Sequence, residues 1–199
     1  MNPKSNFNKN NSIKKMKKSV QSLALAFGIT AISFVANAQN VMVGGEQMYP
    51  QKNIVENAVN SKDHTTLVAA VGAAGLVETL KSAGPFTVFA PTNAAFGKLP
   101  AGTVETLVKP ENKATLTKIL TYHVVAGKLD SKAIMKAIKA GNGVATLTTV
   151  SGGKLTAKMN GEHNVILTDE KGGMANISVY DVYQSNGVIH SIDTVLMPN

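Results

Sequence analysis

The sequence predicts an α+β domain in which several short helices of the first half pack on a mostly antiparallel β-sandwich formed largely by the second half. Helical periodicity is confined to residues before Gly141, and five strand-like segments follow it. Glycine-containing turns separate those segments, and a single strand stands early, at Phe86–Ala90. Helices and strands that are segregated along a chain are typical of α+β folds.

The helices are predicted from their caps and from apolar residues spaced three and four positions apart. Asn53, with Glu56 three residues later, is a variant of the capping box, and Pro110 stands at the favoured first position of a helix. Gly141 closes the last helix. One helix is expected to begin at Asn53. Further helices are expected at 67–74, 76–81, 110–122 and 131–140, together with a single helical turn capped by Thr92 or Asn93 and a short helix that begins at Thr103.

Strands are predicted where short apolar segments lie between turn signals, because successive side chains of a strand point to opposite faces. The early strand ends at Pro91, which cannot donate a backbone hydrogen bond. Turns such as Ser151–Gly153 and Asn160–Gly161 favour hairpins between the later strands. Those strands are expected at 146–150, 155–159, 165–168, 177–183 and 188–196.

The N-terminal region has the pattern of an export signal. Met16–Lys18 form a positive start, Ser19–Val35 an apolar run that is too short and too polar to span a membrane comfortably, and Ala36–Ala38 a small-x-small cleavage site. Cleavage after Ala38 would leave a secreted or periplasmic chain that begins at Gln39. The expected organisation is an N-terminal extension upstream of the true start (1–15), a signal peptide (16–38), a flexible tether (39–52) and one domain (53–198).

The net charge of +8 does not indicate a nucleic-acid partner. All 20 basic residues are lysine, and arginine, which binds phosphates and guanine edges through two parallel hydrogen bonds, is absent. Six of the lysines precede residue 19, so the basic character belongs mainly to the leader. Cysteine is also absent, which excludes disulfides, thiolate metal sites and a cysteine nucleophile.

The segment VIHSIDTV (Val188–Val195) raises the question of a catalytic triad, because it holds a histidine, a serine and an aspartate in four consecutive positions. In a strand, however, His190 points to one face and Ser191 and Asp193 to the other. His190 therefore cannot take a proton from Ser191. The G-x-S-x-G motif of an exposed nucleophilic serine is also absent. We predict that His190 is a core or rim histidine that hydrogen-bonds to the backbone.

The other polar candidates are interpreted in the same way. His123 ends an apolar helix stripe and is expected to be buried and hydrogen-bonded, whereas His64 and His163 are expected to be exposed. Asp169 and Glu170 are expected on the solvated face of a turn. No histidine has a partner at a metal-ligand spacing, and the phosphate-binding glycine motifs are absent. We therefore predict no catalytic residue, no metal site and no cofactor.

A row of lysines is the one surface feature that suggests a ligand. Lys132, Lys136 and Lys139 line one side of the last predicted helix and could meet an anionic polysaccharide. Such rows are more often only the solvated face of a helix.

Three segments of the chain resemble the motifs of fasciclin domains. GPFTVFAPTNAAFGKLP (Gly84–Pro100) is similar to the first signature block, and NGVIHSIDTVLMP (Asn186–Pro198) is similar to the second. ILTYHVVAGKL (Ile119–Leu129) carries the tyrosine–histidine motif between them. The chain departs from the family pattern at Asn93, where aspartate is common, and at Ser191, where an apolar residue is usual.

The resemblance, which covers about 53–198, implies a wedge-shaped α+β domain and a role in adhesion or in binding at cell surfaces and in extracellular matrix. In animal relatives the tyrosine–histidine motif is linked to adhesion, so the resemblance marks Tyr122 and His123 as a possible adhesion motif. The same pair also serves the fold in that family, where the histidine is held by hydrogen bonds.

We therefore expect an exported, non-catalytic binding or adhesion module that interacts with cell-surface, matrix or biofilm components. Its partner would be an extracellular or surface protein or a polysaccharide; the mature chain would be a monomer and not an integral membrane protein. One alternative is an extracellular hydrolase or small-ligand carrier with a cleft near His123 or His190. Another is an envelope-maintenance protein whose partner is a second protein.

Overall fold

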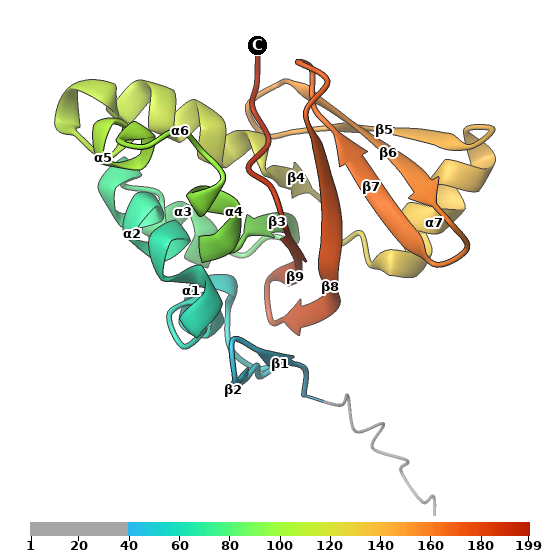
Figure 1. Ribbon diagram of the computed structural model, residues 1–199. Helices are drawn as coiled ribbons and strands as arrows, with labels where there is room; N and C mark the ends of the chain where they lie inside the picture. Colours follow the sequence, from blue (N-terminus) through green and yellow to red (C-terminus); the bar gives the residue numbers. More distant parts are fainter. Residues whose placement is uncertain (1–39) are drawn as a thin grey trace, which may run out of the picture. The chain divides into compact units, whose positions relative to one another are not determined.

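The structure is a computed structural model, and it describes residues 40–199 (Figure 1). The expected N-terminal extension and the export signal with its cleavage site after Ala38 lie outside these residues. From residue 40 onward, no helix has both the length and the apolar character needed to cross a membrane.

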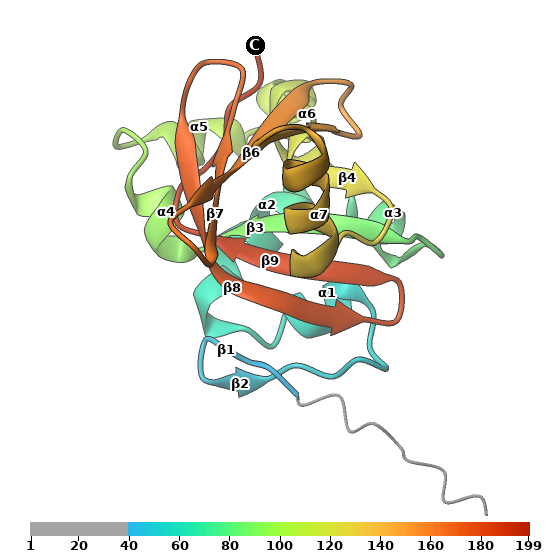
Figure 2. The same cartoon turned by 90° about the vertical axis from the view of Figure 1, so that its right-hand side faces the viewer.

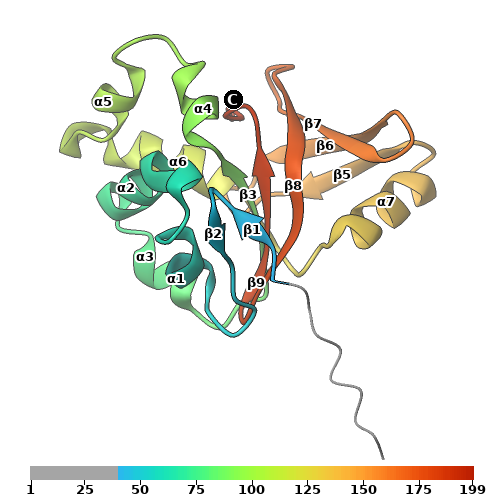
Figure 3. The same ribbon diagram turned by 60° about the horizontal axis from the view of Figure 1, so that its bottom comes forward.

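The α+β fold predicted from the sequence is confirmed: all the α-helices except the last gather on one side of the central strands, and most of the sheet lies on the other side with that last helix (Figures 1 and 3). The α-helices are α1 (Ile54–Ala58), α2 (Thr65–Ala74), α3 (Val77–Lys81), α4 (Asn93–Gly97), α5 (Thr103–Leu107), α6 (Lys113–Tyr122) and α7 (Ser131–Ala140). Two 3-10 turns, at Lys62–His64 and Pro110–Asn112, precede α2 and α6.

Seven strands form one sheet in the order β4-β3-β9-β8-β7-β6-β5. Neighbours are antiparallel except for β3 and β9, which run parallel. The strands of this sheet are β3 (Phe86–Pro91), β4 (Val124–Ala126), β5 (Val144–Thr148), β6 (Lys154–Asn160), β7 (Asn164–Thr168), β8 (Met174–Gln184) and β9 (Gly187–Ile192). A bridge between Val125 and Thr149 joins the two ends of the sheet, so the sandwich is one sheet that bends back on itself.

Two apolar cores lie on opposite faces of β3 and β9. The helix-side core lies between helices α1 to α6 and these strands, and it includes Val88 and Ala90 of β3. The sheet-side core lies between these strands and β5 to β8, where Phe89 of β3 points, and α7 closes it against β5 and β6 (Figure 2). Because β3 is buried on both faces, its side chains alternate between two apolar environments, as expected for a central strand.

Helix ends follow the local signals in the sequence. The capping box is formed: Asn53 accepts a hydrogen bond from the Glu56 N–H, and the Glu56 carboxylate accepts one from the Asn53 N–H. Thr92 caps α4 by accepting from the Ala95 N–H, at 3.2 Å. These bonds satisfy N–H groups that the first turn of a helix leaves without a partner inside the helix.

Residues expected as a flexible tether contain a small hairpin. β1 (Met42–Val43) and β2 (Glu46–Gln47) pair antiparallel across a turn in which Gly44 and Gly45 have φ of 60° and 78°. Val43 and Met48 are buried in the helix-side core, and the Tyr49 backbone bonds the Asn57 side chain in both directions. The sequence did not predict this hairpin, because two residues per strand are too few to show a period.

Candidate functional site

Tyr122 and His123, the possible adhesion motif, close the C-terminal end of α6. Tyr122 is fully buried in the sheet-side core. Its hydroxyl donates to the Lys154 carbonyl (2.7 Å) and accepts from the Glu170 N–H (3.1 Å). Burial raises the pKa of the phenol to about 12, so it stays protonated. The tyrosine therefore joins α6 to β6 and to the turn after β7.

His123 points to the opposite side, toward the helices. It is 2% exposed; its Nδ1 donates to the Ile119 carbonyl (2.8 Å) and its Nε2 accepts from the Leu196 N–H (3.0 Å). Burial lowers the pKa of the imidazole to about 4, so it is neutral at pH 7. The predicted burial and hydrogen bonding of His123 are confirmed. Neither side chain of the motif is exposed to a partner on the domain surface.

His190 lies on the sheet-side face of β9, as the alternation of the strand predicts. Its Nε2 donates to the Leu129 carbonyl (2.8 Å), and its Nδ1 accepts from the Asp181 N–H (3.3 Å). Its ring stacks on Phe89 at a centroid distance of 5.7 Å, and burial lowers its pKa. The interpretation of His190 as a backbone-bonded core histidine is confirmed.

His64, which was expected to be exposed, is in fact buried, with 3% exposure. Its Nδ1 lies 2.8 Å from Ser61 Oγ, and its Nε2 lies 3.3 Å from Ser191 Oγ on the helix-side face of β9. The contact spans 127 residues of sequence, so no local pattern predicts it. Ser191 itself was the available signal, because fasciclin domains usually have an apolar residue there.

The contact between Ser191 and His64 does not have the geometry of a catalytic site. Ser191 is 1% exposed and does not line the cavity described below, so a substrate has no route to its hydroxyl. The second imidazole nitrogen of His64 faces the Ser61 hydroxyl, whereas a hydrolytic triad has a carboxylate there. Burial lowers the pKa of His64, which keeps the ring neutral at pH 7. The three side chains form an internal polar link.

Of the two acidic residues after β7, one is exposed as predicted and the other is not. Glu170 is exposed, but Asp169 is buried. Asp169 accepts hydrogen bonds from the backbone N–H groups of Lys171, Gly173 and Met197, at 2.7–2.9 Å. It therefore closes a turn and holds the C-terminal segment against it.

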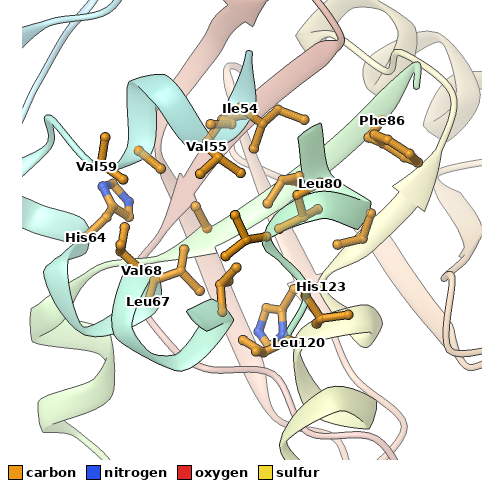
Figure 4. Close-up of a pocket in the computed structure, with 18 of the residues that line it drawn as sticks. Ile54, Val55, Val59, His64, Leu67, Val68, Leu80, Phe86, Leu120 and His123 are labelled. Carbon is orange, nitrogen blue, oxygen red and sulfur yellow. The ribbon is translucent and has the colours of Figure 1, made fainter. Parts of the chain in front are cut away.

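A cavity of about 540 Å³ lies within the helix-side core (Figure 4). Helices α1, α2 and α3 form one wall, and strands β4, β3 and β9 form the opposite wall. His64 and His123 are among its few polar lining residues. Typical apolar lining residues are Val55, Val68, Leu80, Val88, Val124 and Ile189. A cavity of this size is in the range of small-molecule sites.

The lysine row predicted on the last helix is present on the surface. Lys132, Lys136 and Lys139 are exposed along α7, on the side away from Ile134 and Ile138, which are buried in the sheet-side core. The Asp130 side chain caps the start of this helix by accepting from the Ala133 N–H (2.8 Å).

Comparisons with known proteins agree with this architecture. Over 146 residues the chain is 48% identical to protein sll1483 of Synechocystis sp., covering 73% of each chain. It is 36% identical over 153 residues to the cell surface glycolipoprotein MPB83 of Mycobacterium bovis, covering 74% of this chain and 61% of that one.

The fold is also found among solved structures. The FAS1 domain pair of the insect cell adhesion molecule Fasciclin I has a TM-score of 0.65 to this chain at 18% identity, covering 74% of this chain and 51% of that one. The Fasciclin domain family matches residues 62–198, which include helices α2 to α7, the seven-stranded sheet and the Tyr122–His123 pair. The chain therefore belongs to the fasciclin domain family.

Proposed function

We propose that this protein is an exported, non-catalytic module that binds cell-surface, matrix or biofilm components. The observation that carries the proposal is its membership of a family with a cell adhesion molecule and a cell surface glycolipoprotein among the matched proteins. His64, His123 and His190 form their hydrogen bonds with groups inside the domain. This supports binding in preference to catalysis, because none of these imidazoles is free to move a proton to a substrate.

Export rests on the sequence pattern at residues 16–38 and cleavage after Ala38. A chain that begins at Gln39 would retain both cores, since every core residue lies between Val43 and Leu196 apart from the partly buried Val41 and Met197. The mature protein would then act in the periplasm or outside the cell. Sequencing the N-terminus of protein recovered from the medium or the periplasm tests this, and a chain that begins before Gln39 would contradict it.

The partner is proposed to be a surface protein or a polysaccharide that contacts the exterior of the domain. Tyr122 and His123 are proposed to support that exterior from within, because both are buried. For an anionic polysaccharide, the exposed lysines of α7 are the site we would expect to be used, because three ammonium groups line one helix face.

The test is a binding screen with the chain that begins at Gln39, applied to glycan arrays, matrix proteins and intact cells of the producing organism. Saturable binding above that of the heat-denatured chain is expected. The triple variant Lys132→Ala, Lys136→Ala and Lys139→Ala is compared with a control triple at the exposed residues Lys109, Lys158 and Lys171.

Three outcomes are informative. Loss of binding in the α7 triple alone would assign an anionic polysaccharide to that helix. Equal binding by both triples to a protein surface would assign a protein partner and remove α7 from the site. Binding no stronger than that of the denatured chain on every surface would contradict the proposed function.

A further inference from the structure

A protein that binds its partner only through its surface does not need the cavity in the helix-side core. Close-packed protein interiors contain few voids larger than a water molecule, whereas this cavity measures about 540 Å³. Its lining crosses four strands, with Val124 on β4, Val88 on β3, Ile189 on β9 and Val182 on β8. The cavity is therefore a continuous space under the helices.

The walls of the cavity define the chemistry of what can fill it. Most lining side chains are aliphatic, and Phe86 adds an aromatic ring. The ring nitrogens of both histidines already have hydrogen-bond partners. Those of His64 face Ser61 and Ser191, and those of His123 face Ile119 and Leu196. Within residues 40–199, no buried side-chain nitrogen or oxygen lacks a hydrogen-bond partner. The interior of the cavity therefore offers a polar ligand group no buried side-chain donor or acceptor that lacks a partner.

Charge near the cavity favours no ionic ligand either. Glu56 and Lys81 are the charged residues that line it, and they are of opposite sign. Glu56 is engaged in the capping box, and Lys81 pairs with Glu78 at 3.1 Å. An ionised head group taken into the cavity would lose its hydration without gaining a partner.

The cavity is reached from the surface of the helical layer. Val59, at the end of α1, is 54% exposed, and Gly72 of α2 is exposed as well; both line the cavity. Val55 and Val68 also line the cavity and are half-buried (Figure 4). Apolar side chains thus continue from the mouth to the strands, which is the route that an apolar molecule needs.

We propose that this cavity is a binding site for one neutral, apolar small molecule of the hydrocarbon-chain class. Aliphatic walls bind such a molecule by burying its surface and filling the void. Dry apolar cavities in proteins take up apolar molecules for the same reason. The proposal is independent of the partner that the domain exterior binds.

The experiment uses the chain that begins at Gln39 and the neutral fluorescent probe N-phenyl-1-naphthylamine. We expect saturable binding of one probe per chain, and displacement of the probe by 1-dodecanol. Dodecanoate, with the same chain length and a carboxylate, is expected to displace the probe at least tenfold less well at pH 7.5. The reverse order would contradict the neutral class of the ligand.

Two glycines provide a matched pair of variants. Gly72 lines the cavity and Gly97 does not; a Cβ added at either residue meets no atom within 4 Å, and neither has positive φ. Gly72→Phe should weaken probe binding at least tenfold by occupying the mouth, whereas Gly97→Phe should leave it unchanged. Val68→Phe, which fills the cavity from α2, is the second blocking variant.

Thermal unfolding of each variant confirms that it is folded before binding is measured. Weaker binding in Gly72→Phe or Val68→Phe, with wild-type binding in Gly97→Phe, supports the site. An absence of saturable probe binding in the wild type, or equal binding in all four folded proteins, would overturn it.

Discussion

His64, His123 and His190 act as neutral hydrogen-bonding groups inside the domain. Each imidazole joins segments far apart in the chain: His123 links α6 to the C-terminal segment, His190 links β9 to the loop before α7, and His64 links β9 to the turn after α1. Burial lowers the pKa of all three. Their role is therefore to fix the positions of the elements they join.

Replacing His123 by alanine should lower the free energy of unfolding by about 1–3 kcal/mol. The change leaves the Leu196 N–H and the Ile119 carbonyl without their partner inside the core. Urea unfolding measures the effect. His163→Ala is the control, because that side chain is 89% exposed and its loss should change stability by no more than about 0.5 kcal/mol. Equal unfolding free energies for both variants would show that His123 is not structural.

Stability should fall as the pH falls from about 6.5 to about 4. Between these values the unfolded chain binds a proton at residue 123 that the folded chain excludes, because burial lowers the pKa of His123 from 6.5 to about 4. The loss from His123 is up to about 3 kcal/mol, and it levels off below pH 4. His64 and His190, whose pKa values are also lowered, add to it in the same direction.

Urea unfolding at a series of pH values from 7.5 to 4 checks this dependence. His123→Gln removes one titrating group and should flatten the curve, whereas His163→Gln should keep the wild-type slope. A His123→Gln curve as steep as that of the wild type would refute the assignment.

At the residue scale, the sequence predicts what depends on alternation within one element. His190 and Ser191 point to opposite faces because they are neighbours in a strand, and this required no knowledge of the rest of the fold. The burial of His64 depends instead on Ser191, 127 residues away. The buried role of Asp169 depends similarly on Met197, which reaches it only after the chain has folded.

At the element scale, Asn186 joins a hairpin to two helices. Its side-chain oxygen accepts from the Ile54 N–H at the start of α1 (3.0 Å), and its nitrogen donates to the carbonyls of Leu80 (2.8 Å) and Ser82 (2.9 Å) at the end of α3. The residue lies in the turn between β8 and β9 and is buried. One amide thus satisfies three backbone groups, one at the start of α1 and two at the end of α3.

Asn186→Ala should lower the free energy of unfolding by about 2–4 kcal/mol, because three backbone groups, of which two are in fully buried contacts, lose their partner. Chemical denaturation measures this. Asn60→Ala is the matched control: its side-chain amide donates a single exposed bond to the Glu56 carbonyl, and it should lose no more than about 0.5 kcal/mol. If Asn186→Ala lowers the free energy of unfolding as little as Asn60→Ala does, Asn186 does not hold these elements together.

The elements with strong local signals could be predicted, and those defined by distant partners could not. α7 was predicted with its observed bounds, from its period and the glycine after it. β4 was missed, because its three residues form a strand only by pairing with β3. The need for glycine at position 187 is likewise set by a distant partner: a Cβ there would collide with the Phe86 carbonyl oxygen across the parallel pairing of β3 and β9.

At the scale of the whole domain, two cores share the central strands. β3 and β9 have the helix-side core on one face and the sheet-side core on the other, so a single pair of strands supports both halves of the fold. The sheet-side core encloses Tyr122, and the helix-side core contains the cavity. This division leaves the exterior free for the proposed surface binding, while the interior offers space for an apolar molecule.

We expect the serine and histidine side chains of the interior to maintain the fold and not to catalyse. Hydrolysis of p-nitrophenyl esters from acetate to dodecanoate by the chain that begins at Gln39 tests it most directly, since the longer esters suit the cavity beside His64. The wild type and a folded Ser191→Ala variant are expected to release p-nitrophenol at the same rate as buffer. Turnover by the wild type that disappears in Ser191→Ala, with unfolding unchanged, would contradict it.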